Sequence, residues 1–143
     1  MQLNLRTDYA LRMLMALAAK DDVVSIDWIA EHYGISRNHL AKVAQDLAAA
    51  GFVETLRGRS GGLRLARQAS QINVGEVVRS LENTNGFVAC MGGKEGCAID
   101  GVCGLKPALA GALEAFLSHL DQFHLGQITG SKCKSCRGSL QSR

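Results

Sequence analysis

The sequence has no apolar stretch long enough to cross a membrane. Its apolar runs fall far short of the roughly 18 residues that a membrane-spanning helix requires. The N-terminus, MQLNLRTDYALRML, also lacks the apolar block of a secretory signal, because charged residues divide it. With 143 residues, 47% of them hydrophobic and 20% charged, the chain suits one globular domain with a small appendage. We therefore expect a cytoplasmic protein whose thiols stay reduced.

The residue patterns that enzymes use are also missing. The sequence contains no Ser/His/Asp arrangement, no phosphate-binding loop and no carboxylate pair that suggests catalysis. None of the histidines has a partner at metal-ligand spacing, so we interpret all four as surface or interface residues: His32, His39, His119 and His124. We predict that the chain is not an enzyme.

The chain has five cysteines, and an odd number fits a framework of disulfides poorly. Three of the five, Cys90, Cys97 and Cys103, lie in a glycine-rich stretch with the spacing C-x6-C-x5-C. Structural zinc sites usually pair cysteines about two to four residues apart, so these wider gaps suit zinc poorly. A 4Fe–4S cluster is larger and takes four ligands, most often thiolates. The loop therefore predicts an iron–sulfur cluster whose fourth ligand is another residue, water or a small molecule.

The other two cysteines, Cys133 and Cys136, form a CxxC near the C-terminus. They stand among basic residues, and nearby positive charge favours the reactive thiolate form of cysteine. One of them could supply the fourth ligand, or the pair could hold a metal alone. Alternatively, both are dispensable parts of a flexible basic tail, which we predict over residues 129–143.

Acidic residues are missing from two stretches of the chain. Residues 57–67 hold four arginines and no acid, and residues 131–143 hold four basic residues and no acid. Residues 71–130 instead carry six acids and three basic residues. Because the net charge is only +3, local patches rather than the total charge would serve nucleic-acid binding.

Apolar periodicity and capping residues predict a helix-turn-helix in the first third of the chain. The expected helices span residues 8–20, 26–33 and 37–50 and follow the capping residues Thr7, Ser25 and Ser36. The exposed start of the third helix carries side chains that hydrogen-bond to base edges and phosphates: Ser36, Arg37, Asn38, His39 and Lys42. Taken alone, the pattern suits a purely structural helical domain equally well.

A hairpin follows these helices and favours the DNA-binding interpretation. Residues 52–56 and 62–65 alternate like strands, and the glycine-rich turn between them carries Arg57 and Arg59. Arginines on a projecting hairpin can contact phosphates or enter a narrow minor groove. The alternative is a solvated hairpin tip with incidental charge. We predict a mainly α fold with a winged helix-turn-helix DNA-binding domain over residues 1–82.

Two more helices are expected, at 74–81 after the capping residue Asn73, and at about 106–122 with Pro107 in its first turn. The second carries one apolar stripe: Leu109, Leu113, Phe116, Leu117 and Leu120. Alanines around this stripe would let another helix approach closely, so we predict a dimerisation helix over 105–128, after a cluster loop over 83–104. The alternative is that the stripe packs only within its own subunit.

Four features together resemble one bacterial family: the opening MQLNLRTDYALR, the segment GISRNHLAKV, the wing RGRSGGLRL and the C-x6-C-x5-C loop. The chain is similar to the winged-helix iron–sulfur regulators, which include the NsrR, IscR and RirA types, and looks most like the nitric-oxide-sensing NsrR type. The resemblance covers residues 1 to about 128. The CxxC tail is not part of the family pattern.

The resemblance implies a homodimer in which each 4Fe–4S cluster is held by Cys90, Cys97 and Cys103, with a 2Fe–2S form as an alternative. In the NsrR type the fourth ligand is an acid from the first helix of the other subunit, and Asp8 matches that position. The IscR type uses a histidine three residues after its last cysteine, where this chain has Lys106. The first cysteine gap is longer than in many NsrR sequences, which leaves the RirA alternative open.

The expected function is repression of transcription at a palindromic operator, with release from double-stranded DNA when nitric oxide attacks the cluster. One alternative is a RirA-like regulator on the same fold that responds to iron or to cluster loss. A second is an iron–sulfur redox or carrier protein without a DNA function.

Overall fold

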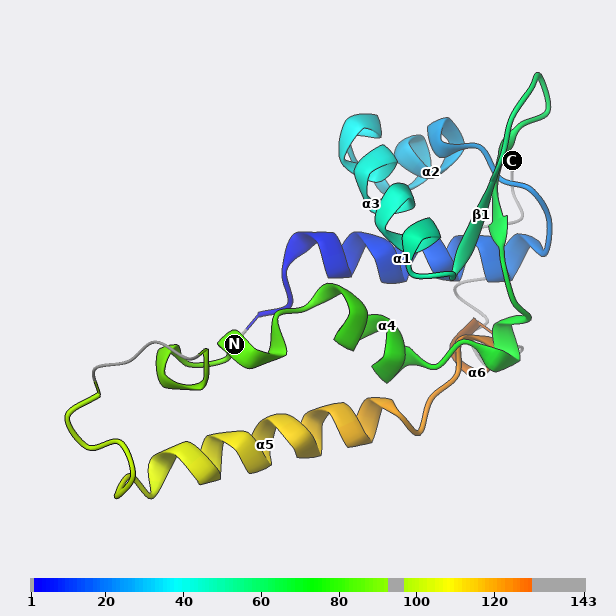
Figure 1. The fold of residues 1–143 in the computed structure, drawn as a ribbon. Helices are drawn as coiled ribbons and strands as arrows, with labels where there is room; N and C mark the ends of the chain where they lie inside the picture. Colours follow the sequence, from blue (N-terminus) through cyan, green and yellow to red (C-terminus); the bar gives the residue numbers. More distant parts are fainter. Residues whose placement is uncertain (1, 93–96, 130–143) are drawn as a thin grey trace.

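A computed structural model describes residues 2–92 and 97–129. The described chain is mainly helical with one small hairpin, as the sequence predicts (Figure 1). Its helices and strands are α1 (Leu5–Lys20), α2 (Ile26–Tyr33), α3 (Arg37–Ala49), β1 (Val53–Leu56), β2 (Gly62–Leu65), α4 (Val74–Leu81), α5 (Leu105–Leu120) and α6 (Leu125–Thr129). Three short 3₁₀ turns accompany them: η1 (Ala69–Gln71), η2 (Thr84–Gly86) and η3 (Ala89–Met91).

The first helix begins earlier than predicted. Asn4, not Thr7, is its N-cap, and the Asn4 side chain accepts a hydrogen bond from the Thr7 amide at 2.8 Å. Asparagine caps helices at least as well as threonine. Thr7 is fully buried inside the first turn and donates its hydroxyl to Asn4 Oδ1 at 3.2 Å. The predicted start at Asp8 was therefore wrong, although Asp8 still lies in the first turn.

The predicted helix-turn-helix is present with small differences at its ends. Ser25 caps α2 by accepting from the Trp28 amide at 3.1 Å, and Gly34 ends α2 with φ at 63°, a conformation that favours glycine. The next helix, α3, ends at Ala49 rather than at residue 50. Ser36 precedes α3 but its side chain makes no capping hydrogen bond. The Ser36 hydroxyl is therefore not used to cap α3.

The hairpin is antiparallel, with Val53 paired to Leu65 and Leu56 paired to Gly62. Its base is joined to the helices, because Leu63 exchanges two backbone hydrogen bonds with Val24, each 2.8 Å long. A Cβ on Gly62 would lie 2.6 Å from the Val24 carbonyl oxygen, so this close approach requires glycine. The wing is thus fixed at its base and projects at its tip.

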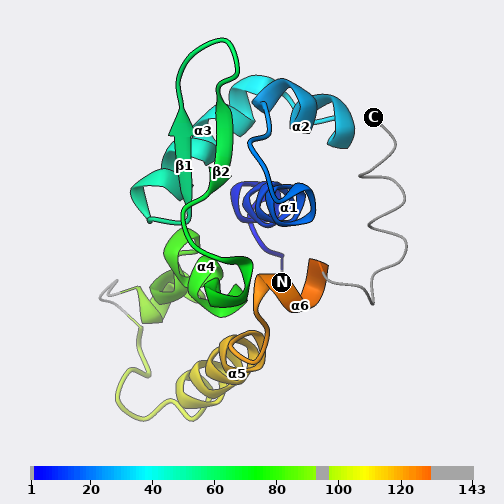
Figure 2. The same ribbon diagram turned by 90° about the vertical axis from the view of Figure 1, so that its right-hand side faces the viewer.

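Helix α1 forms the centre of the molecule (Figure 2). It packs against α3 and β2 on one side and against α4 and α6 on the other. The fully buried side chains of Met13, Leu14 and Leu17 lie at this centre, at about 0–1% exposure. Burying aliphatic side chains is the main source of stability in such a small core. Asp8 therefore projects from an element whose position the core determines.

Helix α5 lies along the outside of α4 and extends beyond the rest of the chain toward the cysteine loop (Figure 1). The helix spans Leu105–Leu120 instead of the predicted 106–122, with Pro107 in its first turn as expected. Of the predicted stripe only Leu117 is buried, and the other four members are half-buried: Leu109, Leu113, Phe116 and Leu120. The contacts with α4 therefore cover the stripe incompletely.

A short helix that we did not predict, α6, follows α5 after a sharp turn. Its Leu125 is 1% exposed, and it packs against α1 and η1. This contact returns the chain from α5 to the central core. Among the described residues, no helix combines the length and the apolar character needed to cross a membrane.

Candidate DNA interface and cysteine loop

The start of α3 presents its polar side chains to solvent, as predicted. Ser36, Arg37, Asn38 and His39 are all exposed, and so is Lys42 one turn later. The side chains that follow on the other face, beginning with Leu40, point into the core. Local sequence thus gives α3 one buried face and one free face, and the free face carries the hydrogen-bonding groups.

Arg37 is not a free cation in this conformation. Its Nε lies 2.7 Å from Asp27 Oδ1 of α2, and both side chains are 70% exposed. An exposed ion pair of this kind contributes roughly 0–1 kcal/mol. A phosphate could therefore displace Asp27 at little cost. Sequence reasoning missed this pair because the two residues belong to different helices.

His39 lies against the N-terminal part of α1. Its ring stacks on Tyr9 with 6.4 Å between the centroids and 28° between the planes. A small depression of about 170 Å³ is lined there by Leu5, Arg6, Tyr9, His39, Lys42 and Val43. The side of α3 that carries His39 and Lys42 is therefore continuous with the start of α1, the helix that also carries Asp8.

The tip of the wing carries two further exposed cations. Arg57 and Arg59 are exposed, and neither forms an ion pair with a described residue. Gly58 between them has φ at 110°, which only glycine adopts without strain. Arg64 instead pairs with Glu54 across the two strands at 2.7 Å. Arg57 and Arg59 are thus available to bind phosphates, whereas a phosphate must compete with Glu54 for Arg64.

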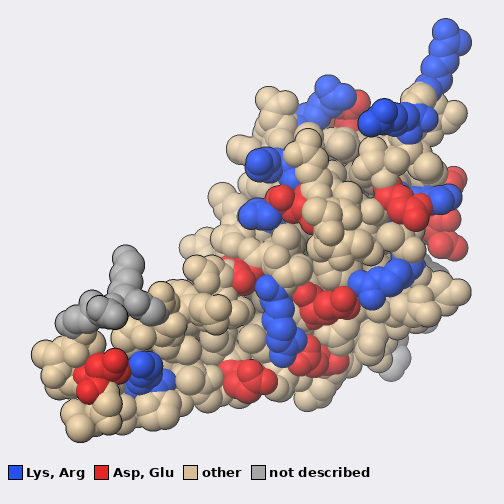
Figure 3. Space-filling view, viewed as in Figure 1, with Lys and Arg blue, Asp and Glu red and all other residues tan. Residues whose placement is uncertain are grey.

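These groups share one side of the molecule. Figure 3 shows lysines and arginines along the upper edge, over α2, α3 and the wing, with most acidic side chains lying below. The exposed basic residues of α3 and the wing include Arg37, Lys42, Arg57 and Arg59. A basic edge formed by a helix start and a projecting hairpin is the arrangement that phosphate contacts require.

The cysteine loop lies at the far end of α5 (Figure 1). Cys90 in η3 and Cys103 just before α5 are half-buried, Cys97 is exposed, and all three are free thiols. The predicted glycine-rich turn is partly defined, with Gly101 at a φ of 88°. Three thiols without a disulfide, each at least partly exposed, are thus carried on one loop, which suits the chemistry of an iron–sulfur cluster.

Lys106, at the start of α5, connects two of these cysteines electrostatically. The pKa of Lys106 is raised first by its hydrogen bond to Asp100, at 3.1 Å, and further by interactions with Cys90 and Cys103. Cys90 and Cys103 therefore act on the same ammonium group. Lys106 occupies the position of the IscR-type histidine, and an ammonium group cannot bind iron as imidazole does.

The described thiols are not gathered into a closed metal site. Within residues 2–92 and 97–129, no three His, Cys, Asp or Glu side chains lie together as ligands of one metal ion. Donor chemistry and loop position fit a cluster, while the assignment of Cys90, Cys97 and Cys103 as ligands stays a prediction. The other pair of cysteines, Cys133 and Cys136, lies outside the described residues.

Asp8, the predicted ligand from the other subunit, has a partner within its own helix. Arg12 Nε donates to its two carboxylate oxygens at 3.1 and 3.0 Å, and Arg12 Nη2 lies 3.0 Å from Oδ2. The pKa of Arg12 is raised, mainly by this hydrogen bond and by the charge of Asp8. The i, i+4 spacing on a helix could have predicted this pair.

Comparison with known proteins identifies the family. The model of the Rrf2 family, described as an iron-dependent transcriptional regulator, matches residues 3–131. The HTH-type transcriptional regulator NsrR of Bacillus licheniformis is 47% identical over 131 residues, which are 90% of this chain and 92% of that protein. NsrR of Bacillus subtilis (strain 168) is 46% identical over 135 residues, 92% of each chain. These names describe regulators rather than enzymes, as predicted for this chain.

Solved structures agree with this fold. CymR, the global cysteine regulator of B. subtilis, superposes with a TM-score of 0.73 at 22% identity, covering 90% of this chain and 96% of that one. T. potens IscR superposes with a TM-score of 0.70 at 25% identity, covering 90% and 85%. The predicted winged-helix fold and the resemblance to NsrR-type regulators are thus confirmed, and the chain belongs to the Rrf2 family of iron-dependent transcriptional regulators.

Proposed function

We propose that the protein is a cytoplasmic, homodimeric repressor that binds a palindromic operator while a 4Fe–4S cluster is intact and leaves it when nitric oxide attacks the cluster. The NsrR relatives support this choice within the family. The observation that carries the proposal is that two kinds of functional group lie at opposite ends of the molecule. The exposed basic edge of α3 and the wing lies at one end of the molecule, and the free thiols lie on a loop at the other.

Cys90, Cys97 and Cys103 would hold the cluster, together with Asp8 of the other subunit. When bound, the cluster supplies iron that reacts with nitric oxide, and a carboxylate is a harder, weaker ligand for that iron than a thiolate. To bind that iron, the Asp8 carboxylate must break or share its ion pair with Arg12. An exposed i, i+4 ion pair contributes only about 0.3–0.5 kcal/mol, so Arg12 does not prevent this exchange.

The DNA contacts would come from the free face of α3 and from the tip of the wing. Ser36, Arg37, Asn38, His39 and Lys42 would read or dock the major groove, and Arg57 and Arg59 would bind phosphates or the minor groove. In a two-fold dimer the two α3 helices must match half-sites about one helical turn apart. Losing the Asp8 tie between subunits would change that spacing and so weaken binding.

The dimer would use the part of α5 that its own chain leaves uncovered. The apolar stripe is only half-buried, and the neighbouring Ala108, Ala112 and Ala115 are exposed. Small residues at these positions let a second helix approach closely. A copy of the same helix, related by two-fold symmetry, would cover both stripes at once.

The test is an anaerobic titration of cluster-loaded protein with nitric oxide, followed by absorbance and resonance Raman while operator binding is measured in parallel. We expect cluster absorbance and DNA affinity to fall together. If the cluster reacts and DNA binding stays unchanged, the assignment of nitric oxide as the signal is wrong. Cys97→Ala should fail to hold the cluster.

A second candidate is an iron- or cluster-status regulator on the same fold, which the family description and the six-residue first cysteine gap favour. It predicts derepression by a chelator alone, whereas the nitric-oxide sensor responds in iron-replete cells. A carrier without DNA function predicts no salt-dependent duplex binding. A repressor that contacts many phosphates should instead weaken steeply as salt rises.

A further inference from the structure

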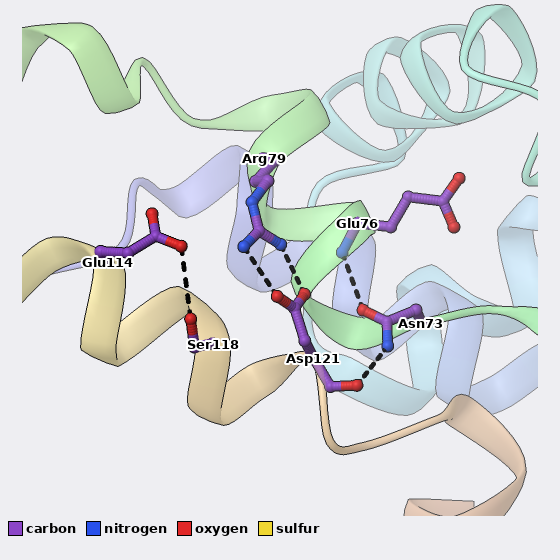
Figure 4. A network of polar contacts seen from close by, with 6 residues as sticks. All are labelled: Asn73, Glu76, Arg79, Glu114, Ser118 and Asp121. Carbon is purple, nitrogen blue, oxygen red and sulfur yellow. Dashed lines mark hydrogen bonds and ion pairs between the residues drawn. The ribbon is translucent and has the colours of Figure 1, made fainter.

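One residue at the end of α5 holds both ends of α4 (Figure 4). The Asp121 carboxylate accepts from Arg79 Nη1 at 2.5 Å and from Arg79 Nη2 at 2.7 Å. Its backbone carbonyl accepts from Asn73 Nδ2 at 2.6 Å. Asn73 is the N-cap of α4 and accepts from the Glu76 amide at 3.1 Å. The start and the last turn of α4 are thus tied to the same residue.

Backbone hydrogen bonds continue this attachment. The Val74 amide donates to the Phe123 carbonyl at 2.9 Å, and the Leu125 amide donates to the Ile72 carbonyl at 2.8 Å. The turn between α5 and α6 is therefore held along the entry to α4. Because α6 then packs on α1, a movement of α5 cannot occur without moving or breaking these bonds.

Gly75 indicates that α4 packs closely against the Arg79–Asp121 pair. A Cβ at this buried position would collide with Asp121 Oδ1 and lie 2.9 Å from Arg79 Nη1. Glycine lowers helix stability relative to alanine, so its presence inside α4 is unfavourable for the helix alone. Room for the paired carboxylate and guanidinium gives a physical reason for glycine at position 75.

The contacts of α4 also extend to the base of the wing. Glu76 Oε1 lies 3.2 Å from Arg67 Nη2, and the Arg67 guanidinium lies 5.2 Å from the centre of the Phe52 ring. Phe52 is 1% exposed and directly precedes β1. A continuous series of contacts therefore runs from the end of α5, along α4, to the base of the hairpin.

Geometry separates the Arg79–Asp121 pair from ordinary surface ion pairs. Exposed pairs usually contribute little, but two parallel N–H···O bonds between a guanidinium and a carboxylate are the recognised exception. Figure 4 also shows Glu114 and Ser118, whose 3.3 Å hydrogen bond stays within α5. Ser118 lies three residues before Asp121 without joining α5 to another element, so it provides a matched control.

We propose that Asp121, Arg79 and Gly75 are positioning residues that transmit the state of the cysteine loop from α5 to α4 and the wing. The proposal rests on the proposed cluster-dependent DNA binding. In this proposal α5 moves as a rigid body, and Cys103 directly precedes its N-terminal end. The paired side chains turn that movement into a shift of α4, and the Glu76–Arg67 contact passes the shift to the hairpin.

The test compares operator affinities of the full-length dimer with and without cluster, and takes their ratio as the coupling. Asp121→Asn and Arg79→Gln should each lower this ratio, by roughly 2- to 30-fold, which is the range for residues that modulate coupling between sites. Ser118→Ala should leave it within about twofold, as expected for a residue outside the coupled contacts. The double variant should lower the ratio no further than either single one, because the pair acts as a unit.

A readout without cluster or DNA checks the structural half of the proposal. In cluster-free protein, the Val74 and Leu125 amides should exchange hydrogen faster in Asp121→Asn than in Ser118→Ala. A normal ratio in Asp121→Asn overturns the coupling proposal while the repressor assignment stands. A wild-type protein whose operator affinity ignores the cluster overturns both.

Discussion

Asp8 and Arg12 lie one turn apart on α1, and Arg12 Nε donates to both carboxylate oxygens of Asp8, at 3.1 and 3.0 Å. The acid that we propose as a cluster ligand across the dimer is therefore paired within its own helix. An i, i+4 pair is weak enough to exchange. In the proposed dimer, Asp8 would exchange Arg12 for the cluster of the other subunit.

Removing Asp8 should change the cluster without abolishing it. Asp8→Ala leaves three thiolates, so we expect a cluster of altered stability, whereas Cys97→Ala should lose the cluster. Iron and sulfide content and anaerobic absorbance of the two variants measure this. Arg12→Ala is the control, since it frees Asp8 without removing it. Normal cluster content in Cys97→Ala would show that the ligand assignment is wrong.

Neutralising the tip of the wing should weaken DNA binding on all sequences. Arg57→Ala and Arg59→Ala each remove an unpaired cation, and removing one phosphate-binding cation should lower the slope of log affinity against log salt by about 1. Arg64→Ala is the matched control, because Arg64 already pairs with Glu54 at 2.7 Å. Fluorescence anisotropy with operator and random duplexes at several salt concentrations measures all three. Equal decreases in affinity for the three variants would contradict the special role of the tip.

Gly75→Ala distinguishes helix propensity from the contact with Asp121. Propensity alone predicts that alanine stabilises α4 by about 1 kcal/mol. A Cβ would instead force the Asp121 carboxylate away from Arg79, and the loss of this paired geometry offsets that gain. We expect no net stabilisation in thermal and urea unfolding of the cluster-free protein. A rise in stability would mean that Asp121 moves aside freely.

Acid should weaken the attachment of α5 through Asp121. Its hydrogen bonds with Arg79 hold the pKa of the Asp121 carboxyl below the ordinary value of 3.8. A carboxyl whose pKa is lower in the folded chain stabilises the fold above the ordinary value. That contribution disappears as the pH falls from 3.8 through the lowered folded pKa. Asp121→Asn should flatten the loss of stability below about pH 4, measured by urea midpoints from about pH 2 to about pH 6 against Ser118→Ala. An unchanged acid profile in Asp121→Asn would contradict the role of this pair.

Several features of the fold depend on only a few neighbouring residues and could be predicted from them. The cap Ser25, the left-handed Gly34 and the cap Asn73 act within one helical turn, so their helices begin and end where predicted. The exposed start of α3 and the arginines of the wing follow from periodicity in the same way. The cysteine spacing likewise depends on the chain alone, and the iron–sulfur cluster that it indicates stays a prediction.

Features that join distant segments could not be predicted, because they depend on how the elements pack. The Asn4 amide donates to Glu82 Oε1 at 2.9 Å, across 78 residues, a contact that holds the true N-cap of α1 and that no local pattern contains. Arg79 and Asp121 are 42 residues apart, and their pairing requires the turn before the unpredicted α6. Charge pairs and glycine clearances of this kind depend on which elements pack together. Local propensity therefore specified the helices and the reactive groups, and packing specified how one end of the molecule is connected to the other.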